Sequence, residues 1–255
     1  MFKRLIHYDF LWDIKLPAYY FAAAVFAALL SRLTDSASSA VGVFLNRFFF
    51  GFAISMIVST LINALIRCWL RFVLTSYKDQ SYLYHTLPVK RETLFFAHLA
   101  SSVLSLLVFL AGAALVAFLL IVGKEAPLQF LRSVFQSGER ISAFFLALLC
   151  LILEFVFLYL CGAAGTVLGY TAASSRTLKS VLISVGLYLG ANALILGALA
   201  LLSRFLPSFA TLFSSGGVDL PSWQIFLAVD LLYLLFCGLW IFLSKRLYEK
   251  KINVE

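Results

Sequence analysis

The sequence predicts an all-α polytopic membrane protein with six transmembrane helices, both termini in the cytoplasm and an interfacial helix at the N-terminus. Three observations lead to this fold class. Of the 255 residues, 63% are hydrophobic and 13% are charged, against roughly 45–50% and ~25% in soluble domains. Apolar runs of about 20 residues, long enough to cross a bilayer as helices, recur along the chain. The charged residues gather between these runs, so one transmembrane domain accounts for residues 1–255.

The apolar windows give the expected spans in chain order. They lie at about 16–31, 43–66, 93–122, 142–170, 178–202 and 223–244. The third and fourth windows hold about 30 residues each, or about 45 Å of helix at 1.5 Å per residue. Because the hydrocarbon core is only about 30 Å thick, these two helices must tilt or project into water.

The basic residues predict the orientation. With six spans both termini share one side, and that side receives fourteen of the 20 Lys and Arg residues, while the other receives six. The first set is Lys3, Arg4, Lys15, Arg67, Arg71, Lys78, Lys90, Arg91, Arg176, Lys179, Lys245, Arg246, Lys250 and Lys251, and the second is Arg32, Arg47, Lys124, Arg132, Arg140 and Arg204. The positive-inside bias therefore places both termini in the cytoplasm.

The first 15 residues, "MFKRLIHYDFLWDIK", predict an interfacial helix rather than a signal peptide. The segment is too long for a signal n-region and carries Asp9 and Asp13, so we expect an uncleaved first span. On a helical wheel its basic residues gather on one side and Trp12 with other apolar residues on the opposite side, as in helices that lie on a membrane surface. Asp9 and Asp13 fall on the apolar side, and a frayed cytoplasmic tail is the alternative.

Several function classes are excluded by what the sequence lacks. The net charge of +8 is spread over connections and forms no basic cluster interleaved with exposed aromatics, so we expect no nucleic-acid partner. The four cysteines show no CxxC spacing, which argues against a disulfide framework or zinc site. The spans offer no Ser–His, paired-Asp or Glu–His set at one depth, so we expect no intramembrane enzyme. The chain also has no GxxxxGK[ST] phosphate loop and needs a partner if ATP drives it.

One conspicuous polar insert, "SYKDQSYLYHTLPVKRETLFFAH", follows the second span at Ser76. Pro88 disfavours helix at Leu87 and is itself tolerated in a first helical turn. The insert therefore predicts a helix, a turn at Thr86 and Leu87, and a new helix. An ordinary loop whose basic residues only hold the orientation is the alternative reading.

The segment "YLYHTLPVKRETLFFAH", placed after the second of six spans, resembles the bacterial type-2 ATP-binding-cassette (ABC) transporter permeases. The resemblance implies that 1–15 form the elbow helix and that 76–86 form the coupling helix, which docks on a separate ATPase. It departs at His98, where members often have Lys, and we assign that position no role. The residues that would contact the ATPase and couple it to the permease are Tyr77, Asp79, Tyr82, Leu83, Tyr84, His85, Leu87 and Pro88.

The resemblance also implies the setting. The chain would be a multi-pass protein of the bacterial cytoplasmic membrane, paired with a second copy or a sister permease and surrounded by lipid. ATP and magnesium would be held by the ATPase, and no cofactor by this chain. The expected activity is export of an amphipathic or lipophilic substrate, such as an antimicrobial peptide, a drug or a lipid.

Three polar residues inside the predicted spans are candidate site residues: Glu154, Asn192 and Asp230. A carboxylate at the centre of a transmembrane helix costs roughly 2.5–3.5 kcal/mol and marks a functional site by default. The structural alternative is a hydrogen-bonded contact between helices, with Asn192 at a depth similar to Glu154. Glu154 and Asp230 keep open a second function, a proton- or ion-coupled carrier.

Small residues predict how two of the spans pack. Gly165 and Gly169 repeat at i and i+4 in the fourth span, and Gly186 and Gly190 do so in the fifth. Such pairs let helix backbones approach closely where lipid provides no hydrophobic drive. We therefore expect the fourth and fifth helices to pack against each other through these glycines.

Overall fold

The structure, a computed structural model, confirms the predicted all-α, six-span fold class. It describes residues 2–35, 39–78, 80–82, 86, 89–121, 129, 132, 134–170, 175–205 and 223–251. This part of the chain forms the long helices α1 (Phe2–Thr34), α2 (Ala40–Tyr77), α4 (Arg91–Ile121), α6 (Gly138–Gly169), α7 (Arg176–Phe205) and α9 (Trp223–Lys251). Each of the six is long and apolar enough to cross a membrane. The side on which the termini lie stays a prediction.

The helices overlap the predicted spans and extend beyond most of them. One large difference is in α2, which continues to Tyr77 where the apolar window ends near residue 66. Its 38 residues correspond to about 57 Å of helix. The extension holds no Pro or Gly, and it buries one face through residues such as Cys68 and Phe72. A buried stripe of this kind continues a helix past the end of its hydrophobic run.

The N-terminal segment also differs from the expectation of a separate elbow. Residues 2–15 and the first span form one uninterrupted helix, α1, with Pro17 inside it. Asp9 and Asp13, which fall on the apolar side of the wheel, are buried at 1% exposure each. The N-terminal part of α1 therefore packs against other helices on the side that carries its acidic residues.

Serine caps set two of the helix starts. The Oγ of Ser39 accepts a hydrogen bond from the Gly42 N–H at 3.1 Å, and that of Ser137 accepts from Arg140 N–H at 3.3 Å. Serine at this position satisfies a backbone donor that has no partner inside the helix. The helices α2 and α6 accordingly begin at the next residue.

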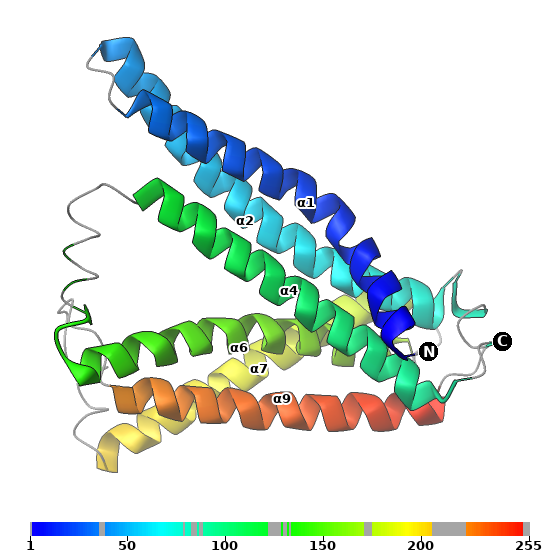
Figure 1. Ribbon diagram of the computed structural model, residues 1–255. Helices are drawn as coiled ribbons and strands as arrows, with labels where there is room; N and C mark the ends of the chain where they lie inside the picture. Colours follow the sequence, from blue (N-terminus) through cyan, green and yellow to red (C-terminus); the bar gives the residue numbers. More distant parts are fainter. Residues whose placement is uncertain are drawn as a thin grey trace. The chain divides into compact units, whose positions relative to one another are not determined.

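The chain divides into two compact units, Met1–Leu128 and Gln129–Glu255. In unit 1, α1 packs along both α2 and α4 (Figure 1). Its apolar core is built from small and branched side chains of all three helices: Ala24, Ala27, Ala28, Ala53, Val116 and Leu120. Because alanine side chains are small, the helix axes can approach each other, and the three long helices pack closely around this core.

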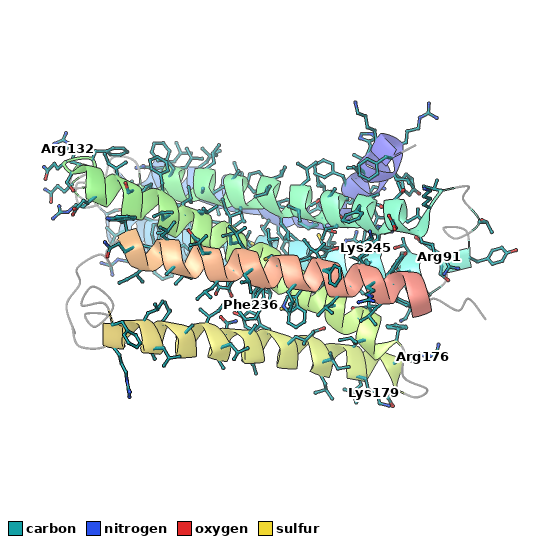
Figure 2. All side chains as sticks on the ribbon, turned by 90° about the horizontal axis from the view of Figure 1, so that it is seen from below. Arg91, Arg132, Arg176, Lys179, Phe236 and Lys245 are labelled. Carbon is teal, nitrogen blue, oxygen red and sulfur yellow. The ribbon has the colours of Figure 1, made fainter. Side chains whose placement is uncertain are left out.

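In unit 2, both α7 and α9 pack against α6 and contact each other little. Phe157, Leu160 and Val167 of α6 are fully buried in this unit. Figure 2 shows Arg176, Lys179 and Lys245 at one end of unit 2 and Arg132 at the other. The basic residues thus mark the helix ends, and the middle of the unit is left to apolar and uncharged polar side chains and two acids.

Candidate functional site

A buried ion pair joins α1 to α2 near the N-terminus. The Arg71 guanidinium donates to Oδ1 of Asp9 through Nη2 at 2.7 Å and through Nε at 2.9 Å. Both side chains are almost fully buried, at 2% and 1% exposure. Nδ1 of His98, on α4, lies 2.8 Å from the other carboxylate oxygen, Oδ2. One carboxylate therefore binds side chains of two other helices.

Two further polar contacts extend this group, which we call the Asp9 cluster (Asp9, Asp13, Arg71, Gln80, His98 and Ser101). Arg71 Nη1 donates to Oε1 of Gln80 at 2.7 Å, and Gln80 belongs to the polar insert beyond the end of α2. The Ser101 hydroxyl donates to Oδ2 of Asp13 at 3.2 Å. The Asp9 cluster therefore connects the insert with all three helices of unit 1.

Aromatic rings surround the cationic part of the cluster. The Arg67 guanidinium lies 4.1 Å from the ring centroid of Trp12, and that of Arg71 lies 5.3 Å from the same centroid. The Phe72 and His98 rings meet edge to face at 6.2 Å. Cations over ring faces are stabilised by the ring quadrupole. The rings also help to exclude water from the Asp9–Arg71 ion pair. Removing one partner of such a buried pair costs much stability, because the other partner would remain as an unpaired buried charge.

The predicted coupling residues fall partly within this part of the structure. Ser76 and Tyr77 form the end of α2, and Lys78 is its cap, so the expected helix over 76–86 does not begin as a separate element at Ser76. The Tyr77 ring packs edge to face on Phe72 at 6.5 Å, whereas Tyr82 is 69% exposed. Asp79, Leu83, Tyr84, His85, Leu87 and Pro88 lie outside the described residues.

Backbone hydrogen bonds follow the insert through its described positions. The Ser81 N–H donates to the Lys78 carbonyl at 2.8 Å, and the Thr86 N–H donates to the Tyr82 carbonyl at 3.1 Å. The second bond has the i to i−4 spacing of an α-helical turn. The new helix predicted after Thr86 and Leu87 is α4, which begins at Arg91.

In unit 2, the structure brings Glu154 and Asn192 into one cluster through a residue that the sequence reading missed. The Tyr188 hydroxyl donates to Oε1 of Glu154 at 2.5 Å, and Asn192 Nδ2 donates to the Tyr188 carbonyl at 3.1 Å. Tyr233 of α9 donates to Oδ1 of Asn192 at 3.2 Å. We call these four residues the Glu154 cluster; it links α6, α7 and α9 at one level.

Asp230, the third predicted intramembrane polar residue, lies one turn before Tyr233 on α9 and is 2% exposed. Neither of its oxygens has a hydrogen-bond partner that the described residues provide, although the Cys150 thiol interacts with it. Cys150 lies one turn before Glu154 on α6 and is close to both carboxyl groups. Asp230 therefore borders the Glu154 cluster.

The glycines divide into two kinds of environment. A Cβ at Gly165 would meet the backbone N and Cα of Ser184 at 2.6 and 2.7 Å, and one at Gly169 would clash with the Ser180 backbone. Both thus lie where α6 and α7 touch. A Cβ at Gly186 or at Gly190 would meet nothing within 4 Å. On the α7 side the close approach is made by Ser180 and Ser184, and not by the predicted glycine pair.

The Asp9 cluster is the larger omission of the sequence reading, which gave Arg71 and His98 no partner. A signal for it is present in the sequence. Asp9 and Asp13 are four residues apart and share one face of α1, and Arg67 and Arg71 have the same spacing on α2. Complementary pairs at i and i+4 on neighbouring helices predict an interhelical ion pair. The spacing does not identify His98 or Gln80.

Comparison with known protein families, with curated proteins and with solved structures found no match to this chain. Within the described residues, no group of three or more His, Cys, Asp or Glu side chains is placed to hold a metal ion. The features that indicate a function are the buried Asp9 cluster, the partly buried Glu154 cluster and the polar insert.

Proposed function

We propose that this chain is the membrane permease subunit of a bacterial ABC transporter, which exports an amphipathic or lipophilic substrate. A separate subunit would bind ATP and magnesium and hydrolyse the ATP. The hydrogen bond from Arg71 to Gln80 carries the proposal, because it fastens the polar insert to the buried junction of three membrane helices. An insert that only sets orientation would need no such attachment.

The Asp9 cluster gives a route for force from the insert into the membrane. A motor subunit that displaces the insert pulls on Arg71 through Gln80, and Arg71 is bound to Asp9 of α1. Asp9 is in turn bound to His98 of α4. Because separating buried charges is costly, the insert and these three helix ends move together. The motor then shifts the permease by binding its two arrangements with different affinity.

The partners follow from the same proposal. The ATPase subunit docks on the insert, which displays Tyr82 at 69% exposure. A second copy of this chain, or a sister permease, completes the transport path between two six-span units. The chain lies in the bacterial cytoplasmic membrane, and lipid covers the remaining apolar helix faces.

A second candidate function is a proton- or ion-coupled carrier that uses Glu154 and Asp230. The observation in its favour is that Asp230 is buried and its carboxylate has no cationic partner within the described chain. The two functions are separated by one assay in vesicles. A carrier transports without any ATPase and follows the proton gradient, whereas the permease needs ATP and its motor subunit.

Charge introduced on the insert is expected to uncouple the permease from its motor. In Leu83→Asp and in Tyr84→Asp, an acidic group would enter the interface with the ATPase, and a buried unpaired charge opposes docking. The chain should still reach the membrane, while ATPase activity in the complex falls to the level of the motor alone. Co-purification of a phosphate-loop ATPase and its hydrolysis rate are the measurements.

The matched control for these variants is Leu33→Asp, an exposed position at the other end of α1. It adds the same charge to unit 1 away from the insert and should leave stimulation intact. Stimulation equal to wild type in both insert variants would count against this proposal.

Loss of the anchor alone is expected to weaken coupling while the fold remains. Gln80→Ala removes the acceptor for Arg71 Nη1 and leaves the Asp9–Arg71 ion pair in place. Because a hydrogen bond to a charged group contributes about 1.5–3 kcal/mol, the free energy of unfolding should fall by no more than this. Stimulated ATP hydrolysis should drop, and Gln80→Glu, which keeps an acceptor, should retain it. Equal activity in Gln80→Ala and wild type would contradict the anchoring role.

A further inference from the structure

The middle of unit 2 holds two acidic side chains, Glu154 and Asp230, and no cation among the described residues of this unit is paired with either of them. Oε1 of Glu154 accepts a hydrogen bond from Tyr188, while Oε2 has no hydrogen-bond partner among the described residues. Asp230 is 2% exposed, and neither of its carboxylate oxygens has a hydrogen-bond partner among the described residues. The basic side chains that Figure 2 labels in this unit lie at its ends, while Phe236 marks its middle. Three carboxylate oxygens thus remain for a donor or a cation.

Asp9 of unit 1 gives the contrasting case of a buried carboxylate with a cation beside it. There, the buried carboxylate of Asp9 binds the guanidinium of Arg71 and approaches the imidazole of His98. A lone carboxylate in the hydrocarbon region costs roughly 2.5–3.5 kcal/mol. The described residues of unit 2 provide Glu154 and Asp230 with no such cation, so either a proton or a cation from outside this part of the chain has to offset their charge.

The surroundings of the two acids indicate what kind of cation fits. The Phe157 ring packs against those of Tyr188, Tyr233 and Phe236, with centroids 6.0, 5.3 and 6.3 Å away. Ring faces attract cations, and most strongly those that shed water easily. Divalent metal ions instead require several oxygen ligands, and the described residues offer no metal-binding group. An organic cation matches these aromatic and acidic neighbours.

The packing of the helices gives such a cation a way in. Both α7 and α9 pack on α6 and touch each other little, and the hydrogen bond from Tyr233 to Asn192 bridges them at the level of Glu154. Parting α7 from α9 breaks this bond and widens the access to Glu154, which is already partly exposed. A cargo with a charged group and an apolar body can enter by this path.

We propose that Glu154 and Asp230 bind the positively charged group of the cargo, an organic cation of the ammonium or phosphonium type carried on an apolar body. The inference rests on the proposed function, whose substrate class it narrows from amphipathic or lipophilic molecules to cationic amphiphiles. Glu154 is the counter-ion at the level of the α7–α9 bridge, and Asp230 adds the second negative charge beside it.

Binding of tetraphenylphosphonium to the full chain in lipid nanodiscs tests this. Its anionic counterpart, tetraphenylborate, has nearly the same size and shape with the opposite charge. We expect saturable binding of the cation that tetraphenylborate does not compete for, and a loss of affinity of about tenfold or more in Glu154→Gln and in Asp230→Asn. Glu139→Gln removes an exposed carboxylate at the start of the same helix and should bind as wild type.

Glu154→Asp, which keeps the charge, should restore binding and so excludes misfolding as the cause of the loss. Equal binding in Glu154→Gln and wild type, competition by tetraphenylborate, or no saturable binding would each overturn the inference; the two acids would then only carry protons. Because the assay contains no ATPase, it separates the two proposals. Charge-selective binding by a chain that stimulates no motor would leave this site standing and refute the permease function.

Discussion

Asp9→Leu is expected to lower the free energy of unfolding by about 3–5 kcal/mol. The substitution leaves the Arg71 guanidinium at 2% exposure without its carboxylate. A guanidinium stays protonated in proteins, so the lone charge cannot be removed by loss of a proton. Oε1 of Gln80 accepts from Nη1 only, and a neutral amide does not replace the charge of the lost carboxylate. Unfolding of the purified chain in detergent micelles, followed by circular dichroism, gives the measurement.

Two companion variants make this result specific. Asp9→Leu combined with Arg71→Met removes both charges and should recover most of the loss, because well-packed apolar residues often replace a buried ion pair at little cost. Asp35→Leu breaks the partly exposed pair with Arg32, whose N and O atoms are 3.7 Å apart, and an exposed hydrogen bond from Asn46. That change should cost less than about 1 kcal/mol. Equal losses in Asp9→Leu and Asp35→Leu would show that the Asp9 cluster does not hold unit 1 together.

Adding one methyl group to each of two glycines is expected to separate α6 from α7. In the double variant Gly165→Ala with Gly169→Ala, both new Cβ atoms run into the backbone of α7, which cannot move aside as a flexible side chain would. Overpacking costs about 1–3 kcal/mol per site, so we expect a loss of about 3 kcal/mol or more in the free energy of unfolding. The same unfolding assay in micelles measures it.

The control uses the other glycine pair, with the same spacing in the neighbouring helix. Gly186→Ala with Gly190→Ala meets no atom within 4 Å. Since alanine favours helix over glycine by about 1 kcal/mol per residue, this variant should be as stable as wild type or more stable. A similar loss in both double variants, or no loss in either, would contradict the assignment of the α6–α7 contact to Gly165 and Gly169.

The number and type of the elements follow from the sequence because membrane helices need long apolar runs, and the runs are plainly separated. The ends of the helices do not follow from the apolar runs alone. The extension of α2 to Tyr77 depends on burial of Cys68 and Phe72 against other helices, which hydropathy does not report. For the same reason α1 continues through residues 2–15, where the composition predicts a surface-lying helix.

The candidate sites were predictable to different degrees. Glu154, Asn192 and Asp230 stand out because a polar residue in an apolar run is conspicuous. The bond between Tyr188 and Glu154 joins residues 34 positions apart, and only the packing of α6 on α7 brings them together. In the Asp9 cluster, the charged residues lie near span ends, where charges are ordinary. The matching i, i+4 spacing of the acids on α1 and of the arginines on α2 indicates a pairing, but His98 and Gln80 join it only through the packing of α1, α2 and α4.

The long separation between Asp9 and Arg71 has a consequence for biosynthesis. The two residues are 62 positions apart in the chain, which a ribosome takes about 3–12 seconds to translate at 5–20 residues per second. During that time the nascent α1 carries Asp9 and Asp13 without the guanidinium, and α1 is also the least hydropathic of the six helices. The ion pair and the packing of this end of α1 therefore form only after α2 has emerged.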